Sequence, residues 1–303
     1  MTRTPGTRTP GSRDFILLIV LSLIWGSAFA LIKIAVVTIP PISLATMRVA
    51  VAAVALLIVL RLSGESFGPG LRQWGHFAAV GMLGNGLPFA LIGYGELRVD
   101  SGLAAILIGV MPVFTVIFAY AFRVERGLTW LRGLGLALGF AGLLVLVGPA
   151  ALGRLGDDGA AHLAIVAAAA CYAATAVYAM RLSQTISIVV LGTGTMVAST
   201  AIMVPVALSI DAPWTLAPAA EALGAAFTLG LVATGFATLI FFKLLASAGA
   251  TFASTINYLI PVIGVILGVA WLGESIGVTE LAAMALVLSG VALVRSGPSP
   301  QSS

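Results

Sequence analysis

The sequence predicts an all-α integral membrane protein of ten transmembrane helices, arranged as two inverted five-helix repeats. Three observations support this fold class: an apolar composition, ten long apolar runs and a set of landmarks that recurs along the chain. Hydrophobic residues fill 60% of the 303 positions and charged residues fill 9%, whereas an average soluble domain carries about 25% charged residues. The mean hydropathy is +1.13, so most of the outer surface must face lipid rather than water.

Ten apolar runs are long enough to cross the hydrocarbon core, which is about 30 Å thick and takes roughly 20 residues of helix. The loops between them are short, so no soluble domain fits between two spans. The first run follows a cationic segment and contains Ala28-Phe29-Ala30, which are features of a secretory signal, but its removal would break the repeat described below. The expected spans are 15–36, 41–62, 75–96, 101–122, 129–148, 160–181, 186–209, 220–245, 250–272 and 279–296.

The distribution of Lys and Arg predicts the orientation of these spans in the membrane. With a cytoplasmic N-terminus, eleven of these residues lie on the inner side and three on the outer side, while Arg48 lies inside a span. Both termini are therefore expected in the cytoplasm. Residues 1–14 and 297–303 are rich in Pro, Ser, Thr and Gly and are expected to be disordered.

Landmarks of the chain recur after a shift of 149 residues, which indicates two copies of one unit. The first copy is expected over 15–150 and the second over 151–296. Because each copy holds five helices, an odd number, the second must enter the membrane from the opposite side, as in transporters that open alternately to either face. The paired landmarks are Gly81 with Gly230, Gly86 with Gly235, Pro112 with Pro261, and Glu125 with Glu274.

The composition excludes several other classes of protein. A net charge of +4, spread over short loops, gives no basic patch for nucleic acid despite a pI of 9.6. The single cysteine, Cys171, rules out a disulfide framework and a cysteine-based metal site. Phosphate-loop, metalloprotease and serine-hydrolase motifs are absent from the sequence. Neither an enzyme activity nor a cofactor or metal is therefore expected.

The positions of the acidic residues and of Arg48 bear on how transport could be driven and on what Arg48 does. Every acidic residue falls at the end of a span or in a loop, which argues against a proton relay through a buried carboxyl group. Facilitated or weakly coupled flux is therefore favoured. Arg48, about seven residues into the second span, is expected to be structural, either by reaching the interface or by pairing with a backbone carbonyl.

Three motifs stand in register with the ten spans and the repeat. They are Trp25-Gly26-Ser27-x-Phe29 followed by Lys33, Pro41-x-x-x-Ala45-x-x-Arg48, and the Pro-to-Glu spacing of thirteen residues that ends the fourth and ninth spans. Together they make the chain, from about residue 15 to 296, similar to the EamA-type members of the drug/metabolite transporter superfamily. The resemblance implies a carrier of the inner membrane, often an exporter of amino acids or related small molecules. It also implies a central cavity between the two halves, lined by spans 1, 3, 4, 6, 8 and 9 with contributions from spans 2 and 7, while spans 5 and 10 lie at the periphery.

The centre of the third span is interrupted by Gly84-Asn85-Gly86-x-Pro88. Pro88 removes a backbone donor and frees the carbonyl near Gly84, so the Asn85 amide beside it is a candidate pole for a polar ligand. Its mate in the repeat is Thr234, and two polar groups at equal depth from inverted halves indicate the midplane. The alternative is that both side chains hold helices together by hydrogen bonds. Of the two, Asn85 is the better candidate for ligand contact.

Other candidates come from aromatic and kinked positions. Trp25 lies too deep for an interfacial belt, so it either lines a pocket or packs the bundle. Pro112 and Pro261 are expected to kink their spans, and the Asn257 amide would be costly against lipid. The full set of expected substrate-binding residues is Trp25, Phe29, Asn85, Pro88, Met111, Tyr172, Thr234 and Asn257.

The leading function is a secondary or facilitative transporter that exports small metabolites, with amino acids favoured, by alternating access. A carrier of nucleosides, organic cations or drugs is the first alternative, and an intramembrane transferase or a non-transporting membrane subunit is less favoured. The expected partners are a small-molecule substrate and the lipid bilayer, with no nucleic acid. Gly135-x-x-x-Gly139 in the fifth span predicts close packing against the fourth span or a second protomer. A monomer is slightly preferred, and a dimer is the alternative.

Overall fold

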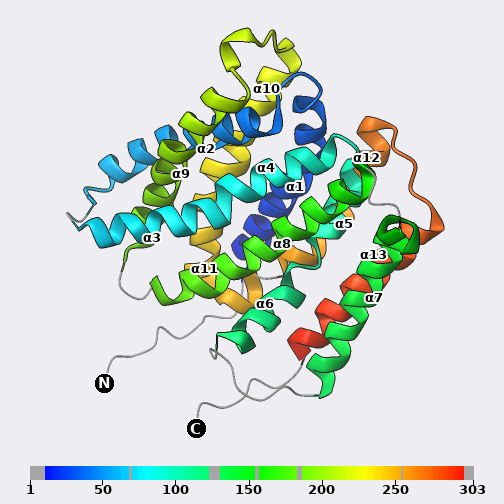
Figure 1. Cartoon of the computed structure of the whole chain (residues 1–303). Coiled ribbons are helices and arrows are strands. Elements are labelled where there is room, and N and C mark those ends of the chain that lie inside the picture. The colour runs from blue at the N-terminus through cyan, green and yellow to red at the C-terminus, as the bar shows by residue number, and fades with distance from the viewer. Residues whose placement is uncertain are drawn as a thin grey trace, which may run out of the picture.

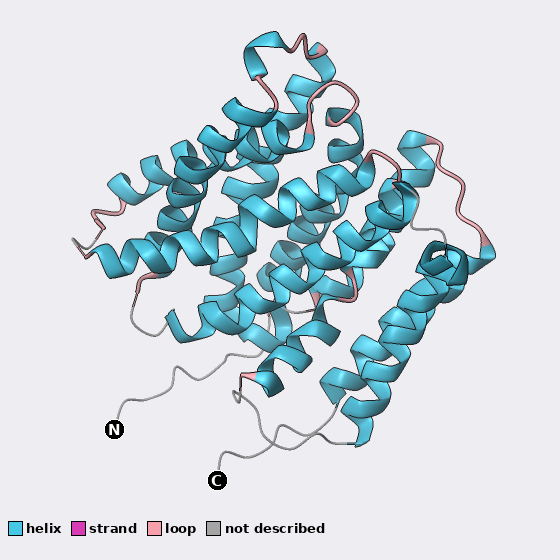
Figure 2. Cartoon of the chain, in the orientation of Figure 1, coloured by secondary structure: helices cyan, strands magenta, loops and turns pink. Residues whose placement is uncertain are grey.

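The protein is a bundle of helices joined by short loops, and the part of the chain that the structure describes contains no strand (Figures 1 and 2). The computed structural model describes residues 11–67, 70–122, 130–153, 157–182, 186–253 and 255–296. The helical segments of the first half are α1 (Ser12–Ala35), α2 (Pro41–Leu62), α3 (Leu71–Gly81), η1 (Met82–Gly86), α4 (Leu87–Glu96), α5 (Ser101–Ile108), α6 (Met111–Ala121) and α7 (Trp130–Gly153). Those of the second half are α8 (Asp157–Leu182), α9 (Ile188–Ile210), η2 (Pro213–Thr215), α10 (Ala220–Thr228), η3 (Leu229–Phe236), α11 (Ala237–Ala253), α12 (Ile256–Leu272) and α13 (Val278–Ser296).

These segments form ten spans, because three spans are each built from more than one segment. The third span combines α3, η1 and α4, the fourth combines α5 and α6, and the eighth combines α10, η3 and α11. Within the described residues, seven helices are long and apolar enough to cross a membrane, and three shorter apolar helices lie at Gly133–Val145, Ile256–Leu272 and Val278–Leu293. The predicted all-α membrane fold with ten helical spans is therefore confirmed.

The expected boundary between the eighth and ninth spans is wrong. α11 continues to Ala253 and α12 begins at Ile256, although the apolar runs alone placed the loop at 246–249.

The two prolines in the middle of spans, Pro112 and Pro261, affect their helices differently. The fourth span breaks before Pro112, which occupies the second position of α6, where a missing backbone N–H costs no helical hydrogen bond. By contrast, α12 runs through Pro261 without a break.

Two π-helical segments occupy matching places in the two repeats. η1 covers Met82–Gly86 and η3 covers Leu229–Phe236, so a shift of 149 residues brings them into overlap. In η1 the backbone N–H of Leu87 bonds to the carbonyl of Met82, five residues earlier. Such wide turns are rare in proteins, and those that occur are often found at functional sites. The glycine-rich interruption that the sequence shows in the third span is therefore a change of helical pitch.

The fifth and tenth spans pack against each other at one side of the bundle, where α7 and α13 run side by side (Figure 1). Glycines allow this close approach, since a side chain at Gly290 would meet the backbone of Gly135 and Gly139. A side chain at Gly139 would also meet Val113 of α6. The small-residue face of the fifth span is thus covered by helices of the same chain, including the fourth span.

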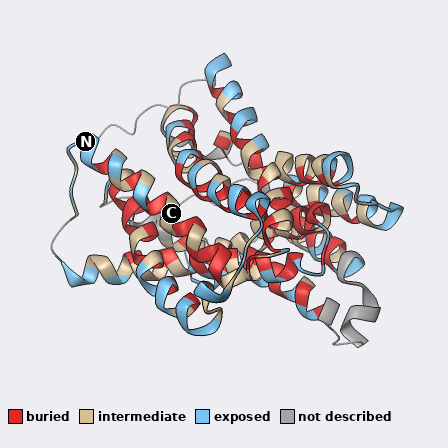
Figure 3. Ribbon diagram, turned by 90° about the horizontal axis from the view of Figure 1, so that it is seen from above, coloured by how far each residue is buried: buried red, intermediate tan, exposed pale blue. Residues whose placement is uncertain are grey.

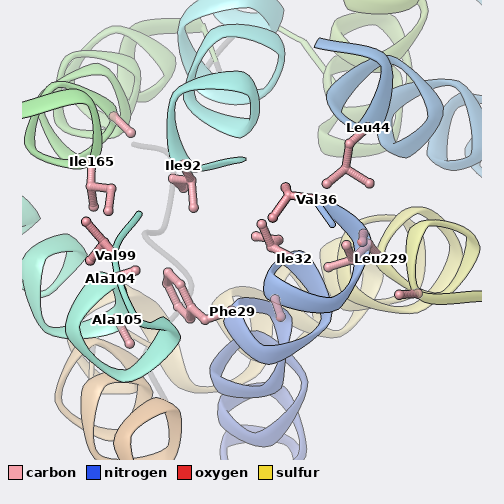
Figure 4. Packing of buried hydrophobic residues seen from close by; sticks show 14 of the residues in the cluster. Phe29, Ile32, Val36, Leu44, Ile92, Val99, Ala104, Ala105, Ile165 and Leu229 are labelled. Atoms are coloured by element: carbon pink, nitrogen blue, oxygen red, sulfur yellow. The ribbon is translucent and has the colours of Figure 1, made fainter. Parts of the chain in front are cut away.

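Buried side chains concentrate where helices face one another, and exposed ones lie on the periphery (Figure 3). The largest buried apolar cluster combines residues from the second half of α1, from α4, α5 and η3, and from the beginnings of α8 and α10. In Figure 4, Ile92 and Phe29 lie on facing helices of this cluster, with Val99 and Ile165 beside them. One half of the bundle is therefore closed by apolar packing.

Candidate functional site

The two ends of the bundle are held by different polar contacts. We call the end that contains Lys33, Asp100 and Glu274 the Asp100 end; these residues line a shallow cavity of about 480 Å³ there. The opposite end is called the Asp14 end, where the Ser247 hydroxyl donates a hydrogen bond of 2.6 Å to Asp14. The apolar cluster of Figure 4 lies in the half of the bundle next to the Asp100 end.

Between the two ends, Arg48 of α2 crosses from the first repeat to the second. Its Nε atom donates a hydrogen bond of 2.8 Å to the hydroxyl of Thr234 in η3, and that hydroxyl donates one of 2.9 Å to the carbonyl of Leu229. The guanidinium carbon lies 3.6 Å from the centre of the Phe89 ring, a cation–π contact. Arg48 is 7% exposed. The expectation that it reaches the interface or pairs with a carbonyl is wrong, because its partners are a hydroxyl and an aromatic face.

Arg48 is only partly satisfied by these contacts. Within the described residues it has no carboxylate partner, and the terminal nitrogens of its guanidinium group donate no hydrogen bond. Burying a cation without a counter-charge is costly, and ionisable groups inside membrane spans usually serve substrate or ion pathways. The two terminal nitrogens have the planar geometry that binds a carboxylate with two parallel hydrogen bonds. The arrangement can therefore hold a carboxylate near the middle of the bundle.

Asn85 lies in η1, in the same span as Phe89. It is half-buried, and its amide forms no hydrogen bond with any residue that the structure describes. The glycines on either side of it allow close packing: a side chain at Gly84 would meet Thr175 of α8, and one at Gly86 would meet Met203 of α9. The backbone of η1 is thus fixed by its neighbours while the amide keeps its hydrogen-bonding capacity.

Trp25 joins α1 to the second π-helical segment. Its indole Nε1 donates a hydrogen bond of 3.1 Å to the carbonyl of Ala233 in η3, and its ring lies 5.6 Å from that of Phe241. Trp25 therefore connects α1 of the first repeat to the backbone of η3 in the second. Phe29, one helical turn further along α1, is buried in the apolar cluster next to the Asp100 end (Figure 4).

The remaining expected site residues divide into two groups. Tyr172 of α8 is half-buried and packs against the apolar cluster that contains Phe89, and Pro88 is buried at the beginning of α4. Met111 instead packs at the start of α6 beside Val113. Asn257 is half-buried in the first turn of α12 and forms no hydrogen bond with the residues described. The structure thus gathers Thr234 and Tyr172 around Arg48, whereas no contact links Met111 or Asn257 to it.

Glu96, the last residue of α4, is fully buried. Neither oxygen of its carboxyl group has a hydrogen-bond partner among the described residues. Its backbone carbonyl accepts a hydrogen bond of 2.9 Å from the Lys33 ammonium group, which also donates one of 2.8 Å to the carbonyl of Val99. Glu96 does lie at the end of its span, as the sequence indicates, but the neighbouring helices bury it there.

The Asp100 end is closed by contacts between the repeats. Glu274, after α12, accepts hydrogen bonds from the backbone N–H groups of Ser101 at 2.7 Å and Gly102 at 2.9 Å, at the positive end of the α5 dipole. Asp211, after α9, accepts two bonds of 2.8 Å from the backbone N–H and hydroxyl of Ser43 at the start of α2. Each carboxylate belongs to the second repeat and each helix terminus to the first.

Sequence reasoning missed Arg48, Phe89 and Glu96 as candidate site residues. Arg48 carried a signal, because an arginine inside a span is itself a reason to expect a functional site. Glu96 carried none, since its position at the end of a span resembles that of an exposed residue. The role of Phe89 depends on the approach of α2 to α4, which no local pattern reveals.

Comparison with known proteins agrees with this architecture. A family model described as "EamA-like transporter family" matches residues 13–148 and again residues 159–296. A solved structure described only as "Crystal structure of protein" has a TM-score of 0.67 at 18% identity and covers 93% of this chain and 97% of its own. That likeness shows the fold alone.

Curated relatives are similar over nearly the whole chain. "Uncharacterized inner membrane transporter YedA" of Escherichia coli (strain K12) is 28% identical over 285 residues, which is 92% of this chain and 90% of the relative. "Probable terminal-alkyne amino-acid exporter" of Streptantibioticus cattleyicolor is 28% identical over 281 residues, which is 91% of each protein. "Uncharacterized transporter" of Archaeoglobus fulgidus is 26% identical over 282 residues, or 93% of this chain and 98% of the relative.

Proposed function

The chain belongs to the EamA-like transporter family, whose model matches both of its halves, and on this premise we propose that it exports amino acids or closely related carboxylate metabolites. It is a membrane transporter built from two EamA repeats and not an enzyme. The protein lies in the inner membrane, like the Escherichia coli relative, whose name describes it as an inner membrane transporter. It works as a secondary or facilitative carrier that opens alternately to the two faces.

The observation that carries the proposal is the buried Arg48, held by one nitrogen only. Its hydrogen bond to Thr234 and its contact with Phe89 fix the position of the guanidinium group without using its terminal nitrogens. A bound carboxylate would accept two charge-assisted hydrogen bonds there and supply the missing counter-charge. Because Arg48 belongs to the first repeat and Thr234 to the second, a carboxylate at this place would be bound between the two halves that move.

Neighbouring groups suit the rest of an amino acid. The Asn85 amide, which has no partner among the described residues, can bind a second polar group of the substrate. Tyr172 and Phe89 present aromatic surface for a side chain. The relative from Streptantibioticus cattleyicolor, whose name says that it exports an amino acid, supports the same substrate class.

Counterflow into proteoliposomes tests this proposal. Vesicles containing the purified protein are loaded with one unlabelled amino acid, nucleoside or organic cation at a time, and the uptake of a trace of the labelled compound is followed. We expect transient accumulation with one or more amino acids. Competition by the same amino acid should be strong, and competition by its methyl ester, which lacks the carboxylate, should be weak.

Other outcomes separate the alternatives. Counterflow with a nucleoside or an organic cation, and with no amino acid, would support the corresponding alternative carrier and overturn the role of Arg48 as a carboxylate anchor. Equal competition by acid and ester would overturn that role as well. Absence of counterflow with every compound would favour a non-transporting subunit.

A further inference from the structure

Glu96 differs from every other acidic residue that the structure describes, because its carboxyl group is fully buried and has no hydrogen-bond partner there. Asp14, the other buried acid, accepts a bond from Ser247, and Glu274 accepts two from the start of α5. Arg48 is buried as well, and only its Nε atom donates a hydrogen bond to a described residue. The bundle thus encloses one cation and one acid whose hydrogen-bonding capacity is unused.

The two groups border the same face of α4. The guanidinium carbon of Arg48 lies 3.6 Å from the centre of the Phe89 ring, and Glu96 ends the helix that contains Phe89. Seven residues separate Phe89 from Glu96, which is almost two turns, so their side chains leave α4 on one face, about 10 Å apart along its axis. Arg48 and Glu96 attract each other across this separation, but they form no ion pair, which requires an N–O distance of about 4 Å or less.

Two further charged groups act on the Glu96 carboxyl from neighbouring elements, Lys33 of α1 and Glu274 after α12. Neither of them donates a hydrogen bond to it. The Lys33 ammonium group bonds instead to the backbone carbonyls of Glu96 and Val99 at the end of α4. Glu274 carries the same charge as an ionised Glu96 and repels it. Among the described residues, therefore, none serves as a cationic donor to this carboxyl group.

A buried charge without a partner is costly, and a single zwitterion would satisfy both groups at once. We propose that Glu96 binds the ammonium group of the substrate while Arg48 binds its carboxylate, which makes the transporter selective for amino acids over carboxylic acids that lack an amino group. The ammonium group donates charge-assisted hydrogen bonds to the Glu96 oxygens, and the two charges of the substrate balance the two charges of the site. This inference rests on the proposed function, because it assigns the second pole of the same substrate site.

α8, which packs on α4, presents small side chains between the levels of the two groups. A side chain at Gly95 would meet Ile165, and further along α8, between Ile165 and Tyr172, lie four consecutive alanines at 167–170. Their small size allows a short ligand to lie between the two groups once the packing loosens. In this conformation the apolar cluster of Figure 4 closes this half of the bundle, so a substrate held by its carboxylate reaches Glu96 as the Asp100 end opens.

Two ligands separate recognition of the ammonium group from general damage to the site. One is the amino acid that gives counterflow, and the other is its deamino analogue, the carboxylic acid in which hydrogen replaces the amino group. The concentration dependence of counterflow in proteoliposomes gives the apparent affinity for the amino acid, and inhibition of that counterflow gives the affinity for the analogue. We expect the wild type to bind the amino acid roughly tenfold or more tightly than the analogue, as befits a charge-assisted hydrogen bond.

Glu96→Gln is expected to abolish this selectivity. The affinity for the amino acid should fall roughly tenfold or more. The affinity for the analogue should not fall, because the substitution removes the repulsion between two carboxylates. Glu96→Asp, which keeps the charge on a shorter side chain, should show an intermediate ratio of the two affinities. Glu221→Gln is the matched control, since Glu221 is exposed in the first turn of α10, and it should keep the ratio of the parent.

The outcomes separate this inference from the proposed function. If the wild type gives counterflow with no amino acid, the proposed function fails and the inference fails with it. If amino acids give counterflow in the wild type and Glu96→Gln keeps the parental ratio, only the inference is overturned. An equal fall in both affinities would overturn it too, because it would show that Glu96 acts through the structure and not on the ammonium group. The melting temperature in detergent shows whether each variant is folded; if Glu96→Gln is not, an unchanged ratio in Glu96→Asp overturns the inference.

Discussion

Arg48 and Thr234 are joined by a buried hydrogen bond of 2.8 Å that connects α2 of the first repeat to η3 of the second. Thr234 can accept this bond because its own hydroxyl proton is donated to the carbonyl of Leu229, five residues earlier in the wide turn of η3. The change of helical pitch in the second repeat thus fixes the position of the arginine from the first. This relationship makes the middle of the bundle sensitive to conservative substitutions at either residue.

Arg48→Lys is expected to weaken transport strongly although it keeps the positive charge. An ammonium group cannot bond to Thr234 and at the same time present two further coplanar donors to a carboxylate. The loss of one charge-assisted hydrogen bond is worth about 1.5–3 kcal/mol, which corresponds to roughly 10–150-fold in apparent affinity. Concentration-dependent counterflow in proteoliposomes measures this change.

Arg61→Lys is the matched control for that experiment, because Arg61 lies in the exposed last turn of the same helix. It should transport like the parent protein. Equal affinity in Arg48→Lys and Arg61→Lys would show that Arg48 does not bind the substrate.

Thr234→Val is expected to destabilise the protein as well as impair transport. The valine removes the acceptor of the Arg48 Nε proton and leaves a buried charged donor unpaired, at a cost of about 1–3 kcal/mol. Thr228→Val, at a half-buried position at the end of α10 where the hydroxyl bonds only to Gly224 of the same helix, should cost much less. Chemical denaturation of both variants in mild detergent compares the free energies of unfolding, and a smaller loss for Thr234→Val would contradict the role assigned to its hydroxyl.

The fold could be predicted from sequence because lipid imposes simple rules. Each span must be apolar and long, and every backbone group must be bonded within its helix, so apolar runs alone located the ten spans. The interruption around Asn85 was visible as glycines and a proline, and the structure shows a wide turn there. The boundary between α11 and α12 was not predictable in the same way, because no charged residue interrupts 244–273 and helix α11 continues to Ala253, past the loop expected at 246–249.

The site was harder to predict because it depends on contacts between distant residues. Thr234 was selected by its place in the repeat, but its partner Arg48 lies 186 positions away in sequence. Burial of Glu96 follows from the packing of α4 on α8, which the identity of neighbouring residues does not encode locally. Met111 and Asn257, both in the expected set of substrate-binding residues, lie in the structure without contacts to Arg48.

Glu274→Gln is expected to loosen the Asp100 end. The two bonds use the two separate oxygens of Glu274, and glutamine has an NH₂ donor in place of one of them, so one bond is lost. The neutral amide also loses the attraction of a carboxylate for the α5 terminus, worth about 1 kcal/mol. Opening should therefore become roughly fivefold more frequent. The rate at which a maleimide labels Val99→Cys, a position 2% exposed in this conformation, measures opening in a Cys171→Ala background.

Glu280→Gln provides the control for this labelling, since Glu280, in the first turn of α13, accepts a hydrogen bond of 2.9 Å from the backbone N–H of Gly277 just before that helix. Its labelling rate should match that of the parent. A rate in Glu274→Gln no higher than in Glu280→Gln would mean that the carboxylate does not hold the end closed.

The orientation of the bundle can be tested with single cysteines in the Cys171→Ala protein. Leu97→Cys and Ser275→Cys lie at exposed positions of the Asp100 end, and an impermeant maleimide should label both in intact cells, because the Lys and Arg bias predicts that this end faces outward. Ser66→Cys, exposed after α2, should react only after the cells are permeabilised. Labelling of Ser66→Cys in intact cells would reverse the predicted orientation; residues 124–127, a second expected inner site, lie outside the described part of the chain.

Asn85→Leu separates a ligand contact from helix packing. The Asn85 amide bonds to no described residue, so its replacement by a leucine of similar volume should cost no hydrogen bond of the folded protein, and the melting temperature should stay near that of the parent. A substrate bound by the amide would instead lose a desolvated partner worth about 1–3 kcal/mol, or roughly 5–150-fold in affinity. Gly86→Leu is the contrasting variant, because a side chain there would crowd Met82 and Met203 and should lower stability. Normal transport by an Asn85→Leu protein that melts well below the parent would identify the amide as a packing group.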